Sequence, residues 1–133
     1  MCWSNLLNFK MSSYLLPEIT MKYNLNQKCF TAVVNSENGE VNPSTHFHYF
    51  QQDEMIWAEY AGGEIKKGFL IGKFIADDEM SFTYQHLNQQ GENRLGKCLS
   101  RIETLPSGKL RLNEQWQWLD GEQETGSSVV EEM

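Results

Sequence analysis

The chain has 133 residues, which is long enough for one domain with its own hydrophobic core and too short for two ordinary domains. Hydrophobic residues make up 40% of it and aromatic residues 12%, which excludes a disordered protein because burial of so much apolar surface can offset the entropy lost on ordering. The net charge is −7, with only 11 basic residues scattered among 18 acidic ones. We therefore expect neither a nucleic acid nor a membrane surface as a partner, because both are bound through clustered Lys and Arg.

The first 22 residues are predicted to be a poorly ordered extension, followed by a single β-barrel domain over residues 23–133. The composition changes at residues 21–24, which read like a translation start. The alternative is an N-terminal segment that folds over one end of the barrel. Residues 1–20 lack the basic start, continuous apolar core and small-residue cleavage site of a secretory signal. The three cysteines are an odd number without metal-like spacing, which favours a reducing, cytoplasmic location.

Turn-forming residues recur along the rest of the chain at intervals typical of an all-β barrel or sandwich. Asn-Gly, Gly-Gly and Asp-Gly pairs among them readily adopt the positive φ angles of tight hairpins, so most connections should be short and antiparallel. The segments between the turns predict eight strands, at about residues 28–35, 44–51, 55–61, 64–75, 80–88, 93–104, 108–119 and 123–131.

Joining the first strand to the last would remove both exposed edges of such a meander. We therefore expect an all-β, eight-stranded antiparallel up-and-down barrel, with a two-sheet sandwich as the structural rival. At eight strands the interior is just wide enough to be filled by side chains or to hold one small ligand. No segment has a sustained apolar stripe of helical period, so any helix is expected in the N-terminal extension.

His46 and His48 lie two residues apart on the second strand, so both imidazoles point to one side and could share a metal ion. Phe47 and Tyr49 lie on the opposite side of the same strand and are the more apolar pair. We therefore expect Phe47 and Tyr49 inside the barrel and the two histidines outside. We predict no metal site. On the third strand the pattern leaves two orientations open, with either Ile56, Ala58 and Tyr60 or Trp57 and Glu59 pointing inward.

Alternation on the fifth and sixth strands identifies further interior side chains. The fifth strand directs Met80, Phe82, Tyr84 and His86 inward, so its interior side becomes polar toward its end. On the sixth strand charged residues mark the outside. This arrangement places the small residues inside, where they would leave room: Gly96, Cys98 and Ser100.

The seventh strand shows the clearest alternation, with an inner side formed by Leu110, Leu112, Glu114, Trp116 and Trp118. Glu114 is the only charged residue of that side, and an unpaired interior carboxylate is costly. Its partner is expected to be Arg94, His86, the Tyr84 hydroxyl, a water molecule or a ligand donor. Near the end of the chain, Ser127 or Ser128 could also reach the interior.

Apolar walls with a few convergent polar groups are typical of a ligand pocket. The predicted ligand-binding residues are Tyr84, His86, Ser100, Glu114, Trp116 and Trp118. The alternative is a satisfied polar network that ties the strands together and binds nothing. We predict no catalytic residue, no cofactor and a small-molecule ligand as the partner, and a homo-oligomer is left open.

Two other functions are weighed against binding. One is a barrel enzyme, an isomerase or a hydrolase-like protein, in which Tyr84, His86 and Glu114 form an acid–base set. It requires that these three side chains converge within hydrogen-bonding reach. The other is a protein-interaction module that uses an outer barrel face, through Trp57 or Phe74.

The segments that carry a family resemblance are residues 60–72, 84–86, 112–118 and 126–132, among them Tyr84-Gln85-His86. From about residue 23 onward the chain resembles a family of small bacterial proteins with avidin-like or calycin-like β-barrels. Some proteins of that kind are labelled N-acetylglutamate synthase. The sequence does not support that activity, because nothing in it supplies the glycine-rich pyrophosphate loop and helix of a common acetyltransferase.

Overall fold

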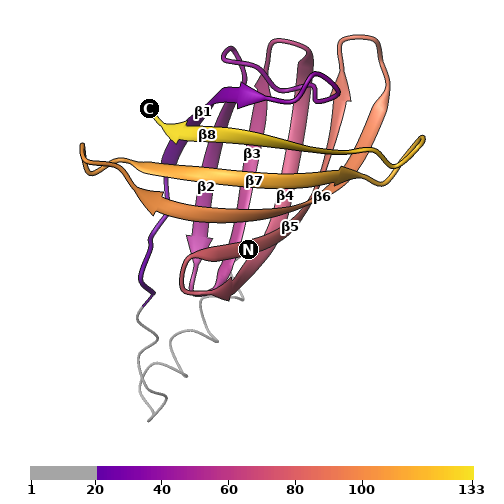
Figure 1. The fold of residues 1–133 in the computed structure, drawn as a ribbon. Helices are drawn as coiled ribbons and strands as arrows, with labels where there is room; N and C mark the ends of the chain where they lie inside the picture. Colours follow the sequence, from indigo (N-terminus) through magenta and orange to yellow (C-terminus); the bar gives the residue numbers. More distant parts are fainter. Residues whose placement is uncertain (1–20) are drawn as a thin grey trace, which may run out of the picture.

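The protein is an eight-stranded antiparallel β-barrel, seen in a computed structural model that describes residues 21–133 (Figure 1). Each strand pairs with the next, and β8 pairs with β1, so the barrel is closed. This confirms the predicted up-and-down barrel and rules out the sandwich. The expected N-terminal extension falls outside the described residues, apart from its last two. The strands are β1 (Lys28–Asn35), β2 (His46–Gln52), β3 (Met55–Gly62), β4 (Ile65–Ala76), β5 (Glu79–Asn88), β6 (Asn93–Thr104), β7 (Leu110–Trp118) and β8 (Thr125–Glu132).

The hairpin between β3 and β4 turns at Gly62 and Gly63, whose φ angles are +115° and +64°. Residues with a Cβ rarely adopt such angles, so the Gly-Gly pair determines where this hairpin turns. β2 begins at His46, two residues later than predicted. The delay arises because Thr45 is held in a turn, in which its amide and its hydroxyl both bond to Asn42.

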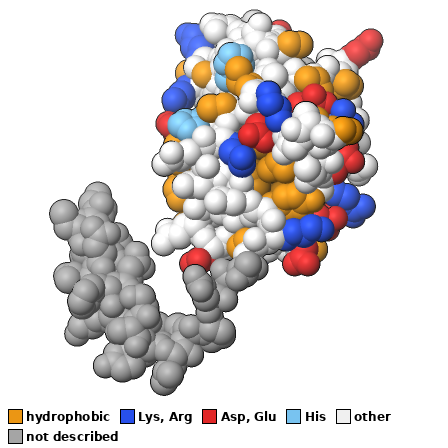
Figure 2. Space-filling view, turned by 90° about the vertical axis from the view of Figure 1, so that its left-hand side faces the viewer, with side chains coloured by type: hydrophobic (Ala, Val, Ile, Leu, Met, Phe, Trp, Pro, Cys, Tyr) orange, Lys and Arg blue, Asp and Glu red, His pale blue; other side chains and the backbone are white. Residues whose placement is uncertain are grey.

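Alternation of buried and exposed side chains defines the inside of the barrel. On β7 the side formed by Leu110, Leu112, Glu114, Trp116 and Trp118 is buried, as predicted. β3 resolves its two open orientations in favour of Ile56, Ala58 and Tyr60. The two β2 histidines point outward, and histidine side chains are visible on the surface in Figure 2.

The sequence suggested that the small interior residues leave empty space. The structure shows that aromatic rings occupy much of that space. The Tyr84 ring on β5 lies directly over Gly96 on the neighbouring β6. In the same way Tyr60 covers Gly68, and Trp116 covers Gly126. A glycine on one strand therefore makes room for an aromatic ring from the next, and the rings fill much of the barrel.

The outside of the barrel is mixed in character. Figure 2 shows acidic and basic side chains interspersed on one face, with hydrophobic side chains between them. Trp57 is half-buried on the outer side of β3, where it stacks on Phe50 at 5.6 Å between ring centroids. Phe74 was expected outside, but it is buried because it shares the inner side of β4 with Leu70. It therefore cannot serve an outer interaction surface. Within residues 21–133 there is no helix of the length and apolarity that crossing a membrane requires.

The connection between β1 and β2, residues 36–45, is longer than the hairpin turns and lies across one end of the barrel (Figure 1). It is anchored to the barrel by several hydrogen bonds. The Asn35 side chain donates to the Val41 carbonyl at 2.8 Å, and the Asn38 side chain donates to the Thr125 carbonyl at 2.9 Å. The indole N–H of Trp118 donates to the Asn38 carbonyl at 3.0 Å. We call residues 36–45 the mouth loop.

Candidate ligand-binding site

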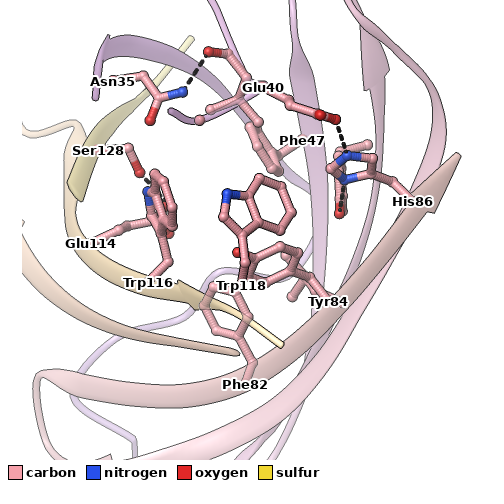
Figure 3. A pocket seen from close by; sticks show the side chains of 14 residues that line it. Asn35, Glu40, Phe47, Phe82, Tyr84, His86, Glu114, Trp116, Trp118 and Ser128 are labelled. Carbon is pink, nitrogen blue, oxygen red and sulfur yellow. Dashed lines mark hydrogen bonds and ion pairs between the residues drawn. The ribbon is translucent and has the colours of Figure 1, made fainter. Parts of the chain in front are cut away.

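A cavity of about 50 Å³ lies inside the barrel beneath the mouth loop. Because one water needs roughly 10–15 Å³ by this measure, the cavity has room for only a few water molecules. The six residues predicted for the site are contributed by three adjacent strands, β5, β6 and β7. Five of them line the cavity, namely Tyr84, His86, Glu114, Trp116 and Trp118 (Figure 3). Ser100 is fully buried and lies opposite Glu114 in the β6–β7 pairing.

Trp118 lies at the centre of the aromatic wall (Figure 3). Its ring meets Trp116 at 5.5 Å, Tyr84 at 5.7 Å and His86 at 5.9 Å between centroids. All three contacts are edge-to-face, a geometry in which the positive edge of one ring faces the negative face of another. Trp118 is thus fixed both by its neighbours and by its bond to the mouth loop.

Glu114 provides the polar floor of the cavity. Its carboxyl accepts a hydrogen bond from the Ser128 hydroxyl at 3.1 Å. Burial raises the pKa of Glu114 from its ordinary 4.5 to about 7, while the Ser128 and Ser100 hydroxyls act in the opposite direction. The Ser100 hydroxyl is close enough to influence this pKa, yet among residues 21–133 it has no hydrogen-bond partner of regular geometry. The carboxyl group can therefore donate or accept a proton near neutral pH.

The partner of Glu114 is thus Ser128 rather than Arg94, His86 or Tyr84, the three side chains that the sequence offered. Ser128 faces inward on β8, and Ser127 faces outward. This resolves the choice that the sequence left open between the two serines. Arg94 and His86 are bonded to other groups at the mouth of the barrel, and the Tyr84 ring packs on Trp118.

His86 bridges the barrel wall and the mouth loop. Its Nδ1 lies 2.9 Å from the Tyr60 hydroxyl, and its Nε2 lies 2.8 Å from a Glu40 carboxylate oxygen. Burial lowers the pKa of His86, and contact with Glu40 opposes that effect. In the neutral ring, Nε2–H donates to Glu40 and Nδ1 accepts from the Tyr60 O–H. Burial raises the pKa of Tyr60 well above its ordinary value, so this hydroxyl stays protonated as a donor.

Arg94 and Asn88 complete the surroundings of Glu40. One guanidinium nitrogen of Arg94 donates to Glu40 at 2.7 Å, and Nε donates to Asp120 at 3.1 and 3.2 Å. The guanidinium also lies over the Trp118 ring, 3.8 Å from its centroid. The Asn88 amide lies 3.3 Å from both Glu40 oxygens. The Glu40 carboxylate therefore accepts hydrogen bonds from three side chains of β5 and β6.

Sequence reasoning missed Glu40, Tyr60 and Asn88 as parts of the site. Glu40 lies in a loop, where no periodicity predicts the direction of a side chain. Tyr60 was named only as one of two orientations of its strand. No signal in the sequence pairs Glu40 with His86, because the two residues are separated by three strands of the barrel wall.

The acid–base set considered for an enzyme does not assemble. Within the described part of the chain, no hydrogen bond joins Tyr84, His86 and Glu114 to one another. The Tyr84 and His86 rings are parallel at 6.5 Å between centroids, and the imidazole is already bonded to Tyr60 and Glu40. Among residues 21–133 there is also no group of three or more His, Cys, Asp or Glu side chains arranged to hold a metal ion.

Comparison with known proteins gives one match. A family model described as avidin-like protein matches residues 23–133, which include the whole barrel. No curated protein and no solved structure matches the chain significantly.

Proposed function

The chain belongs to the avidin-like protein family, as its resemblance predicted, and on that premise we propose that the barrel binds a small, partly apolar molecule in the cavity beneath the mouth loop. The fold itself suggests small-molecule binding in general. The observation that carries the proposal is the cavity wall, where Trp116 and Trp118 meet a buried carboxyl group whose pKa is about 7. Apolar walls with a few convergent polar groups are the usual composition of a ligand site.

Each predicted residue has a role in this proposal. The indoles of Trp116 and Trp118 stack on the apolar body of the ligand. Glu114 makes the polar contact at the floor, and Ser100, which lies opposite it on β6 behind the cavity lining, supports its carboxyl group. Tyr84 and His86 line the upper wall.

Binding requires movement of the mouth loop. Pockets for metabolite-sized ligands occupy roughly 300–1,000 Å³, and the cavity of about 50 Å³ is far smaller. Gly39, Glu40 and Val41 of the mouth loop line its upper side. Withdrawal of these three residues enlarges the cavity while the closed barrel stays intact.

Tryptophan emission and thermal melting test this function. A panel of nucleosides, pterins, flavins and aromatic acids is added to the wild type, to Trp116→Phe and to Trp57→Phe. We expect at least one compound to change the emission and raise the melting temperature of the wild type, because a ligand that prefers the folded state stabilises it. The Trp116→Phe variant should bind that compound more weakly, and Trp57→Phe should bind it normally, since Trp57 lies outside. A panel without effect on wild-type emission or melting contradicts the proposal.

A further inference from the structure

At the mouth of the barrel, the side chains that donate hydrogen bonds lie on strands, whereas the carboxylate that accepts them lies on a loop. His86, Arg94 and Asn88 belong to strands β5 and β6, and His86 is directly opposite Arg94 in their pairing. The acceptor, Glu40, belongs to the mouth loop. Figure 3 shows its side chain reaching from the loop above the cavity toward His86.

Each of the three donors also has a partner other than Glu40. Arg94 is held by Asp120 and by the Trp118 ring. The Tyr60 hydroxyl holds the His86 ring at Nδ1, and the Glu40 carboxylate, which can only accept, selects the tautomer in which Nε2–H points at the mouth. Asn88 also donates to Glu92 at 2.9 Å. The strands and their neighbouring turns therefore hold the three donors together from the side opposite the loop.

These donors require an acceptor. The His86 side chain is only 2% exposed, so withdrawal of Glu40 alone would leave a buried N–H without a partner. A ligand carboxylate that takes the place of Glu40 restores each hydrogen bond and the same local charge. The exchange of one carboxylate for another therefore changes neither the number of hydrogen bonds nor the local charge.

From this geometry we propose that His86, Arg94 and Asn88 form an anion subsite for the carboxylate of the ligand. Glu40 of the mouth loop occupies this subsite in the free protein, and a small carboxylic acid displaces the Glu40 side chain when it binds. The inference rests on the proposed binding function and specifies its ligand class. The apolar body of the acid would then lie below, against Trp118, which the guanidinium of the subsite already contacts.

The surroundings favour a single negative charge. Asp120 lies beside Arg94, and Glu92 lies beside Asn88, so two carboxylates flank the subsite. A dianion such as phosphate would be repelled by both, whereas a carboxylate carries the same charge as Glu40. Inorganic phosphate is therefore an informative competitor in the test.

Chemical rescue tests the subsite without knowledge of the natural ligand. Glu40→Ala removes the acceptor, and we expect its melting temperature to fall and then to be restored by acetate but not by acetamide. Glu37→Ala is the matched control, because Glu37 is an exposed acid of the same loop. It should show neither the loss nor the rescue. Adding Arg94→Gln to Glu40→Ala should abolish the rescue, and phosphate should rescue less than acetate.

A second pair of probes extends the test to ligand binding. We expect Glu40→Ala to bind phenylacetate about tenfold or more tightly than the wild type does, as measured by calorimetry, with no such gain for phenylacetamide. An equal gain for both probes overturns the anion subsite but leaves binding in the cavity standing. Absence of acetate rescue also overturns the subsite. Failure of the proposed function is read separately, from the ligand panel on the wild type.

Discussion

Glu114 is a carboxyl group in an apolar interior, with one hydroxyl bonded to it and a second nearby. Such a group is more easily protonated in the folded barrel than in the unfolded chain, so the stability of the protein must depend on pH through it. Its neighbours on the inner side of β7, Leu112 and Trp116, are large and apolar, and they exclude the water that would otherwise stabilise the charge.

We predict that Glu114→Gln removes this pH dependence. The folded pKa of about 7 is above the ordinary 4.5, so the wild type loses stability relative to the variant as pH rises from 4.5 to 7. Over that window the difference in unfolding free energy should reach roughly 3 kcal/mol. Urea unfolding of both proteins at pH 4 to 8 measures it. The contribution of His86 to the pH dependence is the same in both proteins and cancels in the difference. If the two plots of stability against pH were parallel, the raised pKa of Glu114 would be contradicted.

At the scale of elements, neighbouring strands pack by placing an aromatic ring of one strand over a glycine of the next. The mouth loop is attached to the ends of the strands by hydrogen bonds. Tyr84 of β5 occupies the space above Gly96 of β6. The indole of Trp118 at the end of β7 holds the mouth loop through the Asn38 carbonyl. Packing between strands and closure of the loop therefore depend on a few side chains at strand crossings.

Gly96→Ala tests the packing of ring on glycine. The new Cβ would overlap the Tyr84 ring, which must move into the cavity. We expect a loss of about 1–3 kcal/mol of stability, the usual cost of overpacking. Lys97→Ala, on the outer side of the same strand, should change stability little. Chemical unfolding gives both values. Combining Gly96→Ala with Tyr84→Leu should recover part of the loss, and no recovery would mean that Tyr84 is not the cause.

Trp118→Phe tests the attachment of the mouth loop. The variant keeps an aromatic ring but loses the hydrogen bond to the Asn38 carbonyl. Amide hydrogen exchange in residues 36–45 should become faster, because the loop opens at a lower free-energy cost, by about 1 kcal/mol. Exchange in β2 and β3 should stay nearly the same. If exchange in the mouth loop were unchanged, this bond would not contribute to closure.

For the whole molecule, closure of β8 on β1 is what creates an inside. The two strands pair from Phe30↔Glu132 to Asn35↔Ser128, with a bulge between Ala32 and Val34. Without this pairing both edges of the sheet would be open to other chains. The interior positions of β8 are consequently sensitive to charge, while its outer positions are not.

Two lysine substitutions on adjacent residues of β8 distinguish inside from outside. Val130→Lys places a charge at a position that is 1% exposed, and we expect the barrel to unfold or aggregate. Val129→Lys, on the outer side, should remain folded with a change of about 0.5 kcal/mol. Circular dichroism and size-exclusion chromatography compare the two. Similar behaviour of both variants would contradict the assigned orientation of β8.

The sequence by itself determined the number of strands, their approximate ends and the inner side of β5, β6 and β7. These features follow from two-residue alternation and from turn residues, which are local properties of the chain. It did not settle the orientation of β3, because apolar residues occur on both of its sides. It also did not place Phe74 correctly, because β4 carries large apolar residues on both of its sides as well.

Only the tertiary structure decided which polar groups meet. Glu40, His86 and Arg94 lie far apart along the chain and come together because the mouth loop crosses the end of a closed barrel. Ser128 reaches Glu114 because β8 pairs with β7 in a particular register. Alternation specifies which side of a strand a residue occupies, whereas contacts across the interior depend on how all eight strands close. No local pattern encodes that closure.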